Sequence, residues 1–244
     1  MPLPRAFKRI IVQDIHLILE ILHKKKKGFS ARNPEELADE IYRYYSLSPG
    51  KVIQEELILI KEKLKETTTI LESLSFTPEE SRVWMYFYSW NDDPDEKLID
   101  SCTTRFYLNL KTRYLQKVLV DLINFHTALR KKAPMMFKIP LWKKLQVAII
   151  NRSDTVVVYA HPELVARLEV KLRSYPENYF ENTIPLFTHK VRPGIGKAFE
   201  PKEETSFLKR FRKITHNNQL FFSYGKYISS LIATLIWINI LGMK

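Results

Sequence analysis

The sequence predicts an α+β fold, in which a helical N-terminal part precedes a mixed or antiparallel sheet packed with helices. Apolar residues recur at helical spacing over most of the first hundred residues. Beyond residue 100, short segments alternate with period two, and the connections between them are long enough to be helical. We therefore expect a helical region at 1–95, an α+β core at 96–215 and a hydrophobic helix at 216–244 that packs on the core.

The N-terminal region has three clear helical segments. IIVQDIHLILEIL has apolar residues at helical spacing and ends in HKKKKG, a solvated last turn with a glycine stop. NPEELADEIYRYYSL starts with Asn-Pro and two acids, and PGKVIQEELILIKEKLKETTTILESL is a long amphipathic segment. TPEESRVWMYFYSW completes the region read as helical, and the acidic, turn-rich NDDPDEKL marks the expected boundary.

Strand signals begin after this boundary. In TTRFYLNL, Arg105 and Tyr107 share one side of the chain, and Phe106 and Leu108 share the other. MMFKIP is a short strand in which Lys138 lies opposite its apolar neighbours, and LQVAIIN and TVVVYA are two further β-branched strands.

Helices are expected at 111–132 and in HPELVARLEVKLRSY, which has an early proline, early acids and late cations. IPLFTHKVRPGIGKAFEP is expected to be irregular, and SFLKRFRKI begins a basic helix. At the C-terminus, ISSLIATLIWINILG falls short of the roughly 20 apolar residues that span a bilayer. We expect a buried helix there and no membrane span.

Charge and cysteine content narrow the class of protein. Residues 1–100 contain 15 Lys/Arg and 18 Asp/Glu, whereas residues 101–213 contain 22 and 9, a balance of +13. This basic half suggests an anionic partner such as phosphorylated protein, nucleic acid or acidic lipid. The single cysteine, Cys102, excludes an internal disulfide framework, and no Cys/His group has zinc spacing. The expectation is a cytoplasmic, metal-free protein.

The sequence contains no Walker loop, GxGxxG, HExxH or nucleophile elbow. The pattern that points to a function is instead a set of cations and phenols that strand alternation places on one face. Arg105 and Tyr107 share a face, Lys138 holds the equivalent position on another strand, and Arg152 precedes the strand that ends at Tyr159. Each residue alone is more often a solvated strand position. Together they suit phosphate binding, and neighbouring cations lower the proton affinity of a lysine, which would make Lys138 a base.

The series RFYLNL, MMFKIP, R-x-D-x-V-V-V-Y, IPLFTHKVRPGIGKAFEP and SFLKRFR resembles the HopA1 (HopA-one) type III effector family, and IYRYY resembles an element of its N-terminal part. The likeness covers roughly residues 35–215. The family includes LanY-type lyases of class V lanthipeptide clusters and the lyase partners of kinase-like proteins in thioamitide pathways. These resemble phosphothreonine lyases, which remove phosphate by β-elimination and use no metal or organic cofactor.

The resemblance implies a role for each matching residue. Lys138 falls on the base that takes the substrate α-proton, and Tyr107 stands where phosphothreonine lyases have a histidine general acid. The phosphate-binding positions fall on the following residues: Arg105, Arg152, Tyr159, Lys190 and Arg210. The family usually shows SFG followed by an arginine, whereas this chain has SFLKRFR, so Arg212 competes with Arg210.

Three functions from different classes remain open at this stage. The first is a phosphopeptide lyase of ribosomal-peptide maturation, with a phosphorylated precursor peptide and a kinase-like protein as partners, no nucleic acid and no cofactor; a homodimer is left open. The second is a non-catalytic module that binds a phosphorylated or leader peptide. The third is nucleic-acid binding by the basic half, which would depend steeply on salt.

Overall fold

The computed structural model describes residues 16, 20, 31–45, 54–90, 96–130, 133–199 and 224–239. The chain forms two compact units. Unit 1 comprises residues 1–47, 186–189 and 200–244, and unit 2 comprises residues 48–185 and 190–199. Residues on both sides of position 95 belong to unit 2.

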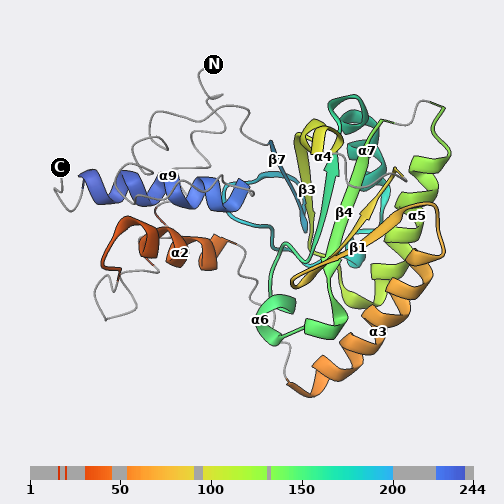
Figure 1. Cartoon of the computed structure of the whole chain (residues 1–244), viewed down its shortest axis with the longest axis horizontal. Helices are drawn as coiled ribbons and strands as arrows, with labels where there is room; N and C mark the ends of the chain where they lie inside the picture. Colours follow the sequence, from red (N-terminus) through yellow and green to blue (C-terminus); the bar gives the residue numbers. More distant parts are fainter. Residues whose placement is uncertain are drawn as a thin grey trace. The chain divides into compact units, whose positions relative to one another are not determined.

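Unit 2 is built on an antiparallel sheet with the strand order β1-β2-β4-β5-β3-β7-β6 (Figure 1). The strands are β1 (Thr77–Ser81), β2 (Trp84–Tyr88), β3 (Thr104–Leu108), β4 (Met135–Pro140), β5 (Val156–Ala160), β6 (His189–Arg192) and β7 (Ile195–Phe199). The helices of unit 2 are α3 (Gln54–Glu72), α4 (Glu96–Ser101), α5 (Leu115–Thr127), α6 (Val147–Ile150) and α7 (Pro162–Ser174). Short 3₁₀ turns lie at Thr112–Tyr114 (η1), Trp142–Lys144 (η2) and Glu177–Tyr179 (η3). The predicted α+β class is confirmed.

Helices α3, α5 and α7 pack on one face of the sheet, because each buries an apolar stripe against the alternate strand residues that point to that face. In α7 the buried residues Leu164, Leu168 and Leu172 recur every four positions. They join the same core as Phe87 and Phe137, whose rings stack with centroids 5.0 Å apart. Full burial of one such side chain contributes about 1.5–3 kcal/mol to folding. The alternate strand residues therefore lie on the other face, away from this core.

Residues 77–88 are not helical, contrary to the expectation. They form the β1–β2 hairpin, in which Ser81 pairs with Trp84 and Arg82 takes a left-handed turn conformation with φ 47°. Pro78 is tolerated because β1 is the outermost strand, and prolines within sheets are confined to such edge strands.

Two further expectations are wrong in detail. LQVAIIN forms the one-turn helix α6 instead of a strand, and the segment expected to be irregular contributes β6 and β7. The RPGIGK run covers the end of β6, the two-residue turn at 193–194 and the first residues of β7. Gly194 has φ +73°, and a Cβ there would lie 2.2 Å from the carbonyl oxygen of Glu181, so this glycine serves close packing.

In the described part of unit 1, the helices α2 (Pro34–Tyr45) and α9 (Tyr224–Asn239) pack side by side (Figure 1). Leu37, Ile41 and Ala233 are fully buried, and the Lys226 ammonium pairs with the Asp39 carboxylate. The expected C-terminal helix is therefore present, and its partner in unit 1 is α2. None of the helices within the described ranges is long and apolar enough to cross a bilayer.

Candidate functional site

The sheet face opposite the helices brings four of the predicted site residues together. Arg105 of β3 pairs directly with Tyr159 of β5. Tyr107 pairs with Val157, which pairs in turn with Lys138 of β4. Neighbouring strands lie about 4.8 Å apart, so the backbones of Tyr107 and Lys138 are about 10 Å apart. These four residues, Arg105, Tyr107, Lys138 and Tyr159, are called the polar face below.

Arg105 and Tyr159 form the most enclosed contact of the polar face. The guanidinium carbon of Arg105 lies 4.7 Å from the ring centroid of Tyr159. The two residues are only 7% and 6% exposed, so the cation and the ring attract one another with little competition from water. This contact holds the guanidinium group against the Tyr159 ring. A planar guanidinium held in this way is suited to bidentate binding of a phosphate.

Lys138 is half-buried, and its ammonium group lies over an aromatic ring. The Nζ atom is 4.0 Å from the ring centroid of Trp84. Trp84 lies on the neighbouring strand β2, two residues before Tyr86, which is the direct pairing partner of Lys138. A cation over an indole face is attracted by the ring quadrupole, so this geometry favours the protonated amine. Neighbouring cations are expected to lower the proton affinity of Lys138, whereas its contact with the Trp84 ring acts to raise it.

Lys138 and Arg105 both act electrostatically on the phenol of Tyr86, the residue of β2 that pairs with Lys138 of β4. Burial raises the pKa of the Tyr86 phenol, and the Lys138 and Arg105 cations each act to lower it. Tyr159 also acts on the same phenol and raises its pKa. Tyr86 thus lies within electrostatic range of three members of the polar face.

Sequence reasoning missed the aromatic border of this face. Trp84, Tyr86 and Tyr88 alternate along β2, and the rings of Tyr86 and Tyr88 stack with centroids 6.2 Å apart. Burial, followed by hydrogen bonding and the negative charge of Glu79, raises the pKa of Tyr88. The signal that could have found these residues is the W-x-Y-x-Y repeat, whose period of two is typical of a strand.

Arg152 is engaged by a carboxylate. Its Nε and Nη2 atoms donate hydrogen bonds of 2.7 and 2.8 Å to the two carboxylate oxygens of Asp154. Asp154 is 4% exposed and lies two residues before β5, so the pair shapes the turn that leads into the strand. A phosphate at Arg152 would have to share or displace this bidentate contact.

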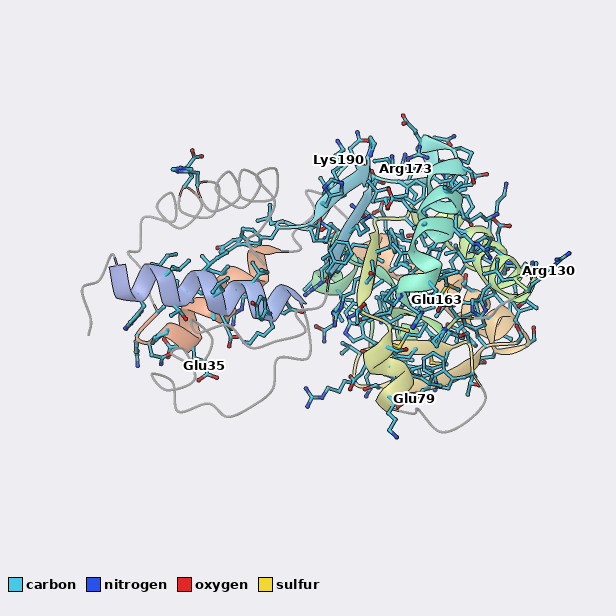
Figure 2. The ribbon with its side chains drawn as sticks, turned by 90° about the horizontal axis from the view of Figure 1, so that it is seen from above. Glu35, Glu79, Arg130, Glu163, Arg173 and Lys190 are labelled. Carbon is cyan, nitrogen blue, oxygen red and sulfur yellow. The ribbon has the colours of Figure 1, made fainter. Side chains whose placement is uncertain are left out.

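The predicted phosphate-binding residues later in the chain are not part of the polar face as far as the structure describes them. Lys190 is exposed on β6, with β7 between it and Arg105, and Figure 2 shows it on the side of unit 2 opposite Glu79 of β1. Arg210 and Arg212 lie outside the described residues. Within the described ranges, His, Cys, Asp and Glu side chains form no group of three that could hold a metal ion.

Comparisons with known proteins identify a family and a shared fold. The model of the HopA1 effector protein family matches residues 84–213. An effector protein structure from Pseudomonas syringae pv. syringae strain 61 is 13% identical to this chain, with a TM-score of 0.55. The match covers 97% of this chain and 88% of the effector chain. An effector protein structure from Pseudomonas syringae pv. tomato strain DC3000 is 14% identical, with a TM-score of 0.48. That match covers 91% of this chain and 94% of the effector chain. No curated protein matches.

Proposed function

Since the chain belongs to the HopA1 effector protein family, we propose that it is a phosphopeptide lyase acting on phosphoserine or phosphothreonine. The observation that supports this proposal is the polar face, where two cations and two phenols lie on three adjacent strands. In the proposed setting a kinase-like protein supplies the phosphorylated precursor peptide. The product is a peptide with a dehydroamino acid, as in lanthipeptide-like maturation.

The proposed reaction is a β-elimination. Arg105 holds the phosphate, and the neutral amine of Lys138 removes the proton from the substrate Cα. The electron pair of that C–H bond first remains on Cα and is shared with the neighbouring carbonyl, as in an E1cB-like elimination. It then forms the Cα–Cβ double bond as the Cβ–O bond breaks. The phosphate leaves with the electrons of the broken bond, and Tyr107 donates a proton to it. Cations that stabilise the developing charge supply several kcal/mol of the barrier reduction.

The position of Lys138 sets a condition for this reaction. A protonated amine over Trp84 cannot accept a proton, so Lys138 must lose its proton and leave the ring when the substrate binds. Loss of a cation–π contact at a partly exposed site costs about 0.5–1 kcal/mol. One hydrogen bond between the Arg105 guanidinium and a phosphate contributes about 1.5–3 kcal/mol, which offsets the lost cation–π contact. Deprotonating the amine costs roughly 1.4 kcal/mol more for each unit by which its pKa exceeds the pH, so the reaction also requires the bound state to lower that pKa.

A second candidate function is phosphopeptide binding without turnover. The contact of Lys138 with Trp84 favours this function, because the ammonium group is held over the ring in the geometry of a bound cation. In such a module the polar face would recognise phosphate by charge, and no proton would move.

Incubation with a phosphoserine peptide separates the two functions. A lyase removes the mass of phosphoric acid from the peptide, and Lys138→Ala abolishes this loss, whereas Lys144→Ala, at an exposed lysine of η2, does not. A binding module leaves the peptide mass unchanged, and its affinity survives Lys138→Ala but falls in Arg105→Ala and Arg152→Ala. If the wild-type protein neither changes nor binds the peptide, both functions are refuted.

A further inference from the structure

A second charged surface lies on the helical side of unit 2, away from the polar face. A groove of about 460 Å³ runs along η1 and α5 beside α3. Its polar lining residues are Lys63, Arg113, Gln116, Lys117, Asp121 and Asn124. We call this surface the α5 groove. It shares no residue with the candidate phosphate site, so it needs its own explanation.

The spacing of the lining residues gives the groove its length. From Arg113 to Asn124 the chain advances eleven positions, which at 1.5 Å per residue is roughly 16 Å. The lining positions recur at intervals of three or four, so they share one side of the helix. An extended peptide covers about 3.3 Å per residue, and the groove therefore matches about five residues of it.

The cations at one end of the groove are held in place by aromatic rings. The guanidinium carbon of Arg113 lies 4.9 Å from the ring centroid of Tyr114, and Nζ of Lys117 lies 5.2 Å from that of Tyr179. The two rings stack on each other with centroids 4.1 Å apart. A cation that is already ordered loses less side-chain entropy when an anion binds.

The charge of the groove is not neutralised by its own residues. Asp121 is engaged by the Lys171 ammonium at 2.6 Å, and Lys63 pairs with Glu66 at 2.8 Å. Burial acts to raise the pKa of Asp121, but Lys171, Tyr175 and Lys117 outweigh it and lower that pKa, so the carboxylate is ionised and occupied. Arg113 and Lys117 form no ion pair among the described residues and are exposed. Lys117 also forms a hydrogen bond with Tyr179 and acts on Asp121, so an anionic ligand would meet an already ordered ammonium group beside the Arg113 guanidinium.

We propose that the α5 groove binds an extended acidic peptide segment through Arg113 and Lys117, with the side-chain amides of Gln116 and Asn124 on its main chain. Side-chain amides both donate and accept hydrogen bonds, which matches the alternating N–H and C=O groups of a peptide. Nucleic acid fits less well. The faces of Tyr114 and Tyr179 are stacked on each other instead of open to a base, and Asp121 places a carboxylate in the floor.

Fluorescence anisotropy with the full chain tests this proposal. The probes are a labelled ten-residue Glu-rich peptide, the same peptide with Gln in place of Glu, and a single-stranded RNA of ten nucleotides. The double variant Arg113→Glu/Lys117→Glu removes the proposed cations. The matched control Arg130→Glu/Arg167→Glu makes the same charge change at two exposed arginines outside the groove, one of which is labelled in Figure 2.

We expect the groove variant to bind the Glu-rich peptide at least tenfold more weakly than the wild type. The control variant should stay within threefold, and the Gln peptide should bind weakly to all three proteins. Binding should also weaken as salt is raised, because the contacts are exposed. Equal losses in the groove and control variants, or tighter binding of the RNA through the same two residues, would overturn the proposal. The readout is affinity, so it does not depend on whether the protein eliminates phosphate.

Discussion

The contact between Arg105 and Tyr159 provides the sharpest test of the polar face. Its guanidinium–ring distance is 4.7 Å and both residues are more than nine-tenths buried, so the interaction lies at the desolvated end of the cation–π range, about 2 kcal/mol. A double-mutant cycle measures it. Arg105→Met removes the cation, Tyr159→Leu removes the ring, and the double variant removes both. We expect a coupling energy of about 1–2 kcal/mol in the free energy of unfolding.

Urea unfolding followed by circular dichroism gives this coupling for the wild type and three variants. Tyr159→Phe is the matched control, because a phenyl ring keeps the attraction and should retain most of the coupling with Arg105. The slope of unfolding against urea must stay constant across the set, or the cycle compares different unfolded states. A coupling below about 0.3 kcal/mol, the usual limit of additivity, would refute the reasoning that these two residues form one unit.

Three further predictions concern other contacts. Gly194→Ala should destabilise the protein by at least about 2 kcal/mol in urea unfolding, because φ is +73° and the new methyl would meet the Glu181 carbonyl; an unchanged midpoint would contradict this. Burial raises the pKa of the Cys102 thiol from 9.0 to about 12, so the folded state keeps a proton that the unfolded state loses above pH 9.0. Its contribution to stability should therefore be fully present below pH 9 and fall by about 1.4 kcal/mol per pH unit between 9 and 12, and Cys102→Ala should flatten this slope. Trp84→Leu should raise the rate of acylation at Lys138, measured by peptide mass spectrometry, about two- to fivefold, because loss of the ring destabilises the ammonium; Trp84→Phe should change it less.

Several elements could be predicted because their signals are local. In TRFYL and MMFKIP, alternation places Arg105 and Lys138 on the face opposite Phe106 and Phe137, and the structure has both strands in these positions. The helix after His161 was equally predictable, since it has a proline at its start, an acid in its first turn and two cations in its last.

Other elements could not be read from the sequence for a physical reason. TPEE has the threonine, proline and acids of a helix start, yet it forms an edge strand because the hairpin pairs it with β2. LQVAIIN is rich in β-branched residues, but a short apolar run does not distinguish a strand from a buried helical turn. In both segments, tertiary pairing overrides the local preference.

The sequence by itself determined which side chains share a face of a strand, because neighbouring residues alternate whatever the strand pairs with. It thereby determined that Arg105 and Tyr107 lie together, and that Lys138 lies opposite the apolar core. Only the tertiary structure decided that β5 lies between β3 and β4, which pairs Arg105 with Tyr159 across 54 positions of the chain and places the Lys138 ammonium over Trp84. Strand order and side-chain direction depend on packing between distant segments, and no local periodicity encodes them.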